Sequence, residues 1–227
     1  MAHRRELSWE PIGLENALRD LVAVVADVRA TTPSNSTRMQ RKTKKWSRQL
    51  AGIVDSLIKI RTELKPQLEK ILGISISNQE LLQVAMFQPS TKNLFSELEV
   101  QLSLDKRSPL DKEVYEVLSS LSEIAQSLAL VGDAAISMAV LHHIWQPKAT
   151  DVGTLTQRRA DIVSNEHLAK VSDSWDLYAH RIHFDPASPS KSEMDHDKGT
   201  LVEAIFGIVY IEHGFKKVRD LIPVLTG

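Results

Sequence analysis

The sequence predicts an all-α protein. Of its 227 residues, 42% are hydrophobic and 25% are charged, which is typical of globular domains. Apolar residues recur at intervals of three and four along nearly the whole chain, and this is the period of an amphipathic helix. Because the period-two alternation of a β-strand is hard to find, we predict helices joined by loops, without strands.

The first 65 residues predict two helices with a polar break between them. Leucine and valine at helical spacing mark the first helix (Leu14–Val28), and leucine, isoleucine and valine mark the second (Leu50–Ile58). The segment 31–37, TTPSNST, is polar and contains a proline, as connections often do. We interpret residues 1–65 as an N-terminal helical extension of a larger domain formed by residues 66–227.

The segment 38–48, RMQRKTKKWSR, is strongly basic. It contains no acid and one aromatic residue, Trp46. Cations that contact phosphates beside an aromatic ring that stacks on bases would suit RNA binding. A solvated helix face next to an acidic neighbour is the alternative. The cations expected to bind RNA are Arg38, Arg41, Lys42, Lys44, Lys45 and Arg48.

The larger domain is also predicted to be helical. Three strongly apolar helices are expected at about 115–146, 154–173 and 199–213. A shorter helix begins at Gln79, with Ser77 or Asn78 as its cap. The charged stretch from about 91 to 114 contains a proline, and we interpret it as an insertion or an irregular connection. The segment DPASPSKSEMDHDKG, which precedes the last helix, is interpreted as a mobile loop.

Two carboxylates interrupt strongly apolar helices. Asp133 is the only charge in LALVGDAAISMAVL, and Glu203 is the only charge in LVEAIFGIVYI. An acid that faces inward is costly unless it is paired or bound to a cation, so a divalent metal ion between the two helices would explain both. For each acid alone, an outward-facing position is the alternative. Gly132 and Gly207 lie within one turn of the acids and allow backbones to approach closely, so we expect the carboxylates to converge.

Several blocks of the sequence resemble the ribonuclease III family. LALVGDAAI at 128–136 resembles the family's signature helix, and VGTLTQRRADIVSNEHLAKV at 152–171 resembles the helix that follows. TLVEAIFGIVYIEHGFKKVRDLI at 200–222 resembles its last block, and NQELLQVAMFQPS its opening helix. The resemblance covers about residues 76–222, with an insertion near 91–120. It implies the ribonuclease III endonuclease-domain fold with an N-terminal helical extension.

The resemblance also implies an activity and a metal site. Family members are metal-dependent endoribonucleases that hydrolyse double-stranded RNA as homodimers, with two acids from the signature helix and two from the last block. Carried onto this chain, the four positions are Ala129, Asp133, Thr200 and Glu203. Asp133 and Glu203 are therefore the expected catalytic residues and the ligands of Mg²⁺ or Mn²⁺, while the other two acids are missing.

The two missing acids leave two interpretations open. The Mini-ribonuclease III branch, which this chain resembles, has Ala and Thr at the same positions and no separate domain for double-stranded RNA, which favours activity. The alternative is a catalytically inactive ribonuclease III-like protein that binds RNA or associates with the ribosome. Arg158 and Arg159 follow the LT step of the second block and are expected to contact RNA, with packing or salt bridging as the alternative.

The composition excludes several other functions. Without cysteine, the chain has no disulfides and no cysteine-based zinc or iron–sulfur site. Its net charge of −1 creates no general attraction to nucleic acid, so RNA affinity must come from local patches. The N-terminus lacks the apolar run of a secretory signal, and no stretch approaches the roughly 20 apolar residues that span a bilayer. We expect a cytoplasmic protein without membrane contact or organic cofactor.

Overall fold

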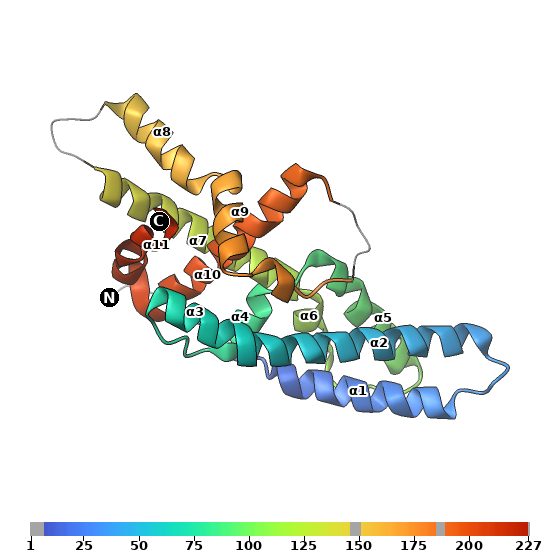
Figure 1. Cartoon of the computed structure of the whole chain (residues 1–227). Coiled ribbons are helices and arrows are strands. Elements are labelled where there is room, and N and C mark those ends of the chain that lie inside the picture. The colour runs from blue at the N-terminus through green and yellow to red at the C-terminus, as the bar shows by residue number, and fades with distance from the viewer. Residues whose placement is uncertain (1–6, 146–150, 185–188, 227) are drawn as a thin grey trace.

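The computed structural model describes residues 7–145, 151–184 and 189–226. Across these ranges the protein is built from helices and short helical turns (Figure 1), with no strand beyond an isolated bridge between Phe87 and Ile182. The predicted all-α fold is confirmed. The helices are α1 (Leu14–Thr31), α2 (Thr37–Lys59), α3 (Lys65–Leu72), α4 (Gln79–Ala85), α5 (Lys92–Leu104), α6 (Lys112–Ser119), α7 (Leu121–Ile144), α8 (Val152–Val163), α9 (Asn165–Ser174), α10 (Lys191–Asp220) and α11 (Ile222–Thr226).

Helices α7 and α10 pack against each other at the centre of the fold and cross at two glycines. A Cβ atom at Gly132 would overlap the carbonyl oxygen of Glu203, and one at Gly207 would overlap that of Leu128. Only glycine permits such an approach of two backbones. The close packing predicted at these two glycines is therefore confirmed.

Helix α7 has the length and composition of a membrane-spanning helix. It has 24 residues with a mean hydropathy of 1.7, so the expectation that no segment approaches this size is wrong. In the structure, 44% of its most apolar window is buried, chiefly against α10. The core helix of a soluble protein is apolar for the same reason, because it packs on more than one side. One such helix is weak evidence for a membrane.

The helix that starts with α2 continues into α3 through a π-helical turn (Ile60–Leu64). Pro66 has no N–H group and would normally interrupt a helix. In the π-helical turn, the N–H of Lys65 donates to the carbonyl of Ile60, five residues earlier, so the helical path continues. The division of the chain at residue 65 remains a prediction, and this boundary lies inside a continuous helical segment.

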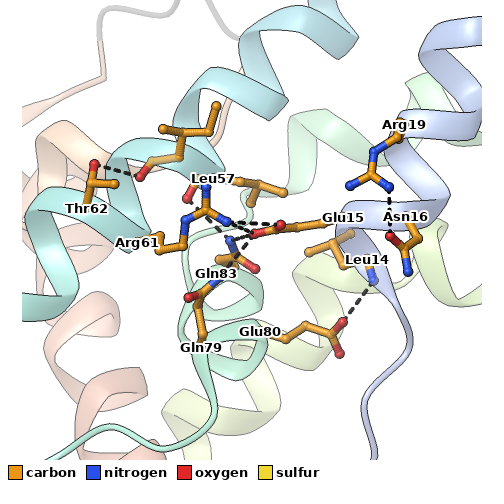
Figure 2. Close-up of polar contacts among 11 residues, drawn as sticks. Leu14, Glu15, Asn16, Arg19, Leu57, Arg61, Thr62, Gln79, Glu80 and Gln83 are labelled. Carbon is orange, nitrogen blue, oxygen red and sulfur yellow. Dashed lines mark hydrogen bonds and ion pairs between the residues drawn. The ribbon is translucent and has the colours of Figure 1, made fainter.

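Helix α1 is attached to α4 through the carboxylate of Glu80 (Figure 2). Glu80 accepts hydrogen bonds from the backbone N–H groups of Ile12 and Leu14, at 2.7 and 2.8 Å, and from the indole of Trp9 at 3.3 Å. Gly13, the cap residue of α1, provides no side chain for these donors. A residue distant in sequence therefore satisfies the N–H groups that the start of a helix leaves free.

A second set of contacts joins α1 to α4 and to the π-helical turn. Glu15 of α1 accepts hydrogen bonds from the side-chain amides of Gln79 and Gln83, at 3.1 and 2.8 Å. It also forms an ion pair with Arg61 at 3.3 Å, as Figure 2 shows. The N-terminal helices are thus fixed to the rest of the fold by specific polar contacts.

The charged stretch after residue 91 is helical, so its interpretation as an irregular connection is wrong. It forms α5 and α6. Helix α5 buries Leu94, Leu98 and Leu102, and α6 buries Tyr115 and Leu118. The leucines recur every four residues, which is a helical period. The charged residues of this stretch lie mainly on the exposed faces of the two helices, and they outnumber the buried apolar residues.

Two further boundaries differ from the prediction. The helix expected at 154–173 is two helices, because Ser164 leaves the helical conformation and caps α9, accepting from the N–H of His167 at 3.3 Å. The expected mobile loop at 185–199 is wrong from residue 190 onward, while residues 185–188 lie outside the described ranges. Ser190 and Glu193 form a reciprocal capping box that starts α10. The S-x-x-E signal for it was present in the sequence.

Candidate active site

Asp133 of α7 and Glu203 of α10 line the same cavity, which has a volume of about 410 Å³. Asp133 is exposed and Glu203 is half-buried. The crossing of the two helices fixes both side chains, because Asp133 directly follows Gly132 and Glu203 lies one turn before Gly207. The structure therefore brings together the two acids that the sequence singled out.

The charge of the Glu203 carboxyl depends on its surroundings. Burial, and after it the negative charge of Asp133, raise the pKa of the Glu203 carboxyl to about 7. A buried carboxylate beside another acid is destabilised in its charged form. A cation bound between the two oxygens would remove this repulsion, so the pair has the electrostatic character of a metal site.

The two family positions that have lost their acids also lie in this cavity. Ala129 and Thr200 line it together with Asp133 and Glu203. Ala129 has no atom that can bind a metal ion, and the Thr200 hydroxyl donates a hydrogen bond to the carbonyl of His196 at 3.0 Å. The four positions thus converge in space, but only two of them supply a carboxylate.

This donor set fits a weakly held magnesium ion. In the part of the chain that the structure describes, no group of three or more His, Cys, Asp or Glu residues is arranged to hold a metal ion. Mg²⁺, however, is commonly bound through one or two carboxylates, with water and substrate phosphate as its other ligands. Asp133 and Glu203 are the residues that would hold it.

Sequence reasoning missed His196 as a residue of the cavity. His196, Thr200 and Glu203 occur at positions i, i+4 and i+7 of α10, so they share one helix face. The His196 ring lies 3.5 Å from the side-chain amide nitrogen of Asn165. The interpretation of this region as a loop concealed the signal, because a loop has no face to assign.

Arg159 is linked to Asp133 through one intervening side chain, whereas Arg158 is exposed on α8. The Arg159 guanidinium donates to the Ser137 hydroxyl at 3.2 Å, and this hydroxyl donates to Asp133 at 3.5 Å. Arg159 can therefore stabilise negative charge at the edge of the cavity. Contact of either arginine with RNA remains a prediction.

The basic segment 38–48 forms the first half of α2, and its aromatic residue is buried. Trp46 is fully buried and its indole N–H donates to Glu97 of α5 at 2.9 Å, so the idea that it stacks on bases is wrong. This hydrogen bond and the nearby Lys45, 3.6 Å from Glu97, hold the pKa of the Glu97 carboxyl below its usual value. The exposed cations of the segment include Arg38, Arg41 and Arg48.

Comparison with known proteins agrees with this geometry. Residues 126–214 match the family model of the ribonuclease III domain. These residues are therefore similar to a ribonuclease III domain. The matched segment contains both acids, Arg158 and Arg159, and it is shorter than the region of about 76–222 in which the sequence resembles the family. The basic segment on α2 lies outside it.

Relatives of the ribonuclease III domain include proteins named Ribonuclease 3. The one from a Nitratiruptor species is 28% identical over 161 residues, which cover 68% of this chain and 57% of the relative. Those from Mus musculus and Homo sapiens are each 24% identical over 190 residues, covering 68% of this chain and 14% of the relative. The chain thus spans only part of the length of the relatives that it matches.

The raised pKa of Glu203 makes stability depend on pH. In the folded protein without metal the pKa is about 7, whereas its ordinary value is 4.5. Between these values the folded state binds more protons than the unfolded state, so stability falls as the pH rises. Glu203→Gln should therefore match the wild type at pH 4 and exceed its free energy of unfolding at pH 8 by about 1–2 kcal/mol, after allowance for solvent screening.

Chemical denaturation in the presence of a chelator, at several pH values, measures this difference. The exposed Glu113→Gln on α6 serves as the control and should show no such trend. A stability difference for Glu203→Gln that is the same at pH 4 and pH 8 would contradict the expectation.

Proposed function

We propose that this protein is a metal-dependent endoribonuclease that hydrolyses double-stranded RNA as a homodimer. Proteins of the ribonuclease III family act on double-stranded RNA, generally as dimers. The observation that supports this function best is the meeting of Asp133 and Glu203 in one cavity, at a glycine-mediated helix crossing inside the ribonuclease III domain. Either acid alone would be an ordinary surface or buried carboxylate.

In this proposal, Asp133 and Glu203 would hold Mg²⁺ or Mn²⁺ at the site where the RNA is cleaved. When bound, the divalent cation supplies a Lewis acid for the phosphate oxygen and lowers the pKa of a water molecule. Glu203 gives up its proton before it binds the cation, because only the carboxylate is a good ligand. Hydrolysis adds water across the bond between phosphorus and the 3′ oxygen, and leaves a 5′-phosphate and a 3′-hydroxyl.

RNA recognition is proposed to depend on the sugar-phosphate backbone. The deep, narrow major groove of A-form RNA prevents side chains from reading base edges there, so proteins contact phosphates and 2′-hydroxyls. Arg159 is linked to Asp133 through Ser137, and Arg158 is exposed on the same helix. Both can contact the phosphates that flank the cleaved bond.

An exposed apolar face of α7 supports the homodimer. The side chains of Leu130, Met138 and Trp145 are 70%, 53% and 61% exposed, and Val152 at the start of α8 is 79% exposed. The spacing of eight and seven residues places the first three on one side of α7, and in Figure 1 the end of α7 projects with α8 from the other helices. Exposed apolar side chains on one side of a helix are typical of an interaction surface, and we propose a second copy of the chain as its partner.

Met138→Lys is expected to convert the dimer into a monomer. The substitution places a charge in the middle of the proposed interface, where it would be buried without a partner. Light scattering coupled to size-exclusion chromatography measures the change. Leu104→Lys, on the 73% exposed Leu104 of α5, should leave the dimer intact. A wild-type protein that is already monomeric would overturn the proposal of a homodimer.

Incubation with end-labelled duplex RNA tests the proposed activity. We expect cleavage in Mg²⁺ or Mn²⁺, no cleavage in the presence of a chelator, and no cleavage of either strand alone. Binding of the duplex without cleavage would instead support the alternative, a catalytically inactive RNA-binding protein. That alternative is favoured by one observation: among the described residues, no group of three or more His, Cys, Asp or Glu side chains is arranged to hold a metal ion.

A further inference from the structure

A second cavity, of about 320 Å³, lies between α2 and the segment 181–184. From α2 it is lined by residues that include Arg48 and Gly52, and from the other side by residues that include Arg181. The segment 181–184 is inside the ribonuclease III domain, whereas α2 lies before it. The N-terminal helices therefore create this groove by packing against the domain.

The groove has the charge of an anion-binding site. No Asp or Glu is among its described lining residues, while Arg48 and Arg181 both are. The Arg181 guanidinium is held in place, because it lies 3.6 Å above the Tyr178 ring and donates to the Tyr178 carbonyl at 3.0 Å. Because a guanidinium has five N–H donors, several remain for a phosphate. Because the Arg181 side chain is already held in one conformation, it loses less conformational entropy when it binds a phosphate.

The floor of the groove is open to a sugar-phosphate backbone. At Gly52, the space that a Cβ atom would occupy has no atom within 4 Å. Gln49, which also lines the groove, has a buried side-chain oxygen without a hydrogen-bond partner among the described residues. Such an unpaired buried acceptor is unusual. Phosphate and ribose hydroxyl are the two groups that RNA offers along its backbone.

The groove and the acid cavity are lined by residues that meet at the isolated bridge. Phe87 lines the acid cavity and Ile182 lines the groove, and these two residues form the isolated bridge of the fold. The bridge is held by hydrogen bonds from the N–H of Gln88 to Ile182 at 3.0 Å and from the N–H of Ile182 to Met86 at 2.8 Å. The bridge therefore brings the segment that lines the groove next to a residue that lines the acid cavity.

Further basic residues of α2 lie in line with the groove. Arg41, Lys45 and Arg48 are spaced by four and three residues, and Gly52 follows after four more, so all four lie on one face of the helix. The groove is thus the end of a line of cations that runs along α2. We propose that the groove formed by Arg48, Gly52 and Arg181 binds backbone phosphates of the RNA strand next to the cleaved bond. The inference rests on the proposed function for the position of that bond.

Binding measurements on groove variants test this inference. Fluorescence anisotropy with labelled duplex RNA, without divalent metal so that no cleavage occurs, gives Kd at several salt concentrations. We expect Arg48→Gln and Arg181→Gln each to weaken binding by about 5- to 10-fold at low salt and to lower the salt dependence by about one phosphate contact. The control is Arg29→Gln, an exposed cation on α1 that does not line the groove, and it should change Kd by less than about 2-fold.

The outcomes separate this inference from the proposed function. If the groove variants bind RNA like Arg29→Gln while the wild type cleaves, the groove proposal is overturned and the nuclease stands. If the groove variants lose affinity but the wild type never cleaves, the nuclease is overturned and the groove stands. A wild type that does not bind duplex RNA at low salt would overturn both. Thermal denaturation of Arg181→Gln shows whether loss of the Tyr178 contact has unfolded the protein. If this variant is unfolded, the RNA affinity of Arg48→Gln tests the groove proposal.

Discussion

Asp133→Asn and Glu203→Gln are each expected to lower the rate of RNA cleavage by a factor on the order of 10² to 10³, because a bound cation contributes several kcal/mol to the transition state. The two residues are the only carboxylates at the four family positions that converge in the cavity. With so few protein ligands, removal of one leaves the cation held by a single side chain. Each amide keeps the size of the acid it replaces, so the helix crossing should be unaffected.

Single-turnover cleavage of labelled duplex RNA measures the loss, and anisotropy measures binding in parallel. RNA affinity should be unchanged or higher in both variants, since each removes a negative charge near the phosphates. Asp161→Asn, an exposed acid on α8 that does not line the cavity, should cleave at the wild-type rate. If both Asp133→Asn and Glu203→Gln keep the wild-type rate, the proposed metal site is wrong.

Gly132→Ala and Gly207→Ala are each expected to lower the free energy of unfolding by more than about 3 kcal/mol. Overpacking of a core commonly costs about 1–3 kcal/mol, and here the added methyl group meets backbone atoms of the opposite helix, which cannot rotate away. The helices must separate to make room. Because Asp133 and Glu203 flank the crossing, any folded protein that remains should also lose cleavage.

Urea denaturation followed by circular dichroism measures this effect. Gly52→Ala is the matched control, because Gly52 lies within α2 and its Cβ position has no atom within 4 Å. This substitution should stabilise the protein by about 0.5–1 kcal/mol, since alanine favours a helix over glycine. Unchanged denaturation midpoints for Gly132→Ala and Gly207→Ala would show that α7 and α10 do not cross as closely as described.

Local signals in the sequence were sufficient for many elements of the fold. The cap at Asn78 is confirmed by its hydrogen bond from the N–H of Leu81 at 3.0 Å, and such caps depend on neighbouring residues alone. The start of α10 was missed, although the Ser190–Glu193 pair carried the signal. The segment that contains this pair was interpreted as a loop because it is highly polar, and its capping residues were not recognised.

Burial was harder to predict than helicity. Trp46 lies in the most basic part of the chain, yet α5 covers it and Glu97 binds its indole. The stretch that contains α5 was itself interpreted as irregular, so no partner for Trp46 was available to the prediction. Which face of an amphipathic helix is covered depends on elements distant in sequence, and composition does not reveal them.

The sequence by itself determined the helical fold, the two candidate acids inside apolar helices and the glycines that let their helices meet. Apolar spacing and the absence of side chains at Gly132 and Gly207 are local properties, so they can be identified from the sequence alone. Only the tertiary structure decided that His196 shares a cavity with the acids, and that α2 and residues 181–184 enclose a basic groove. Such neighbours meet through packing between segments far apart in the chain, and packing depends on three-dimensional shape.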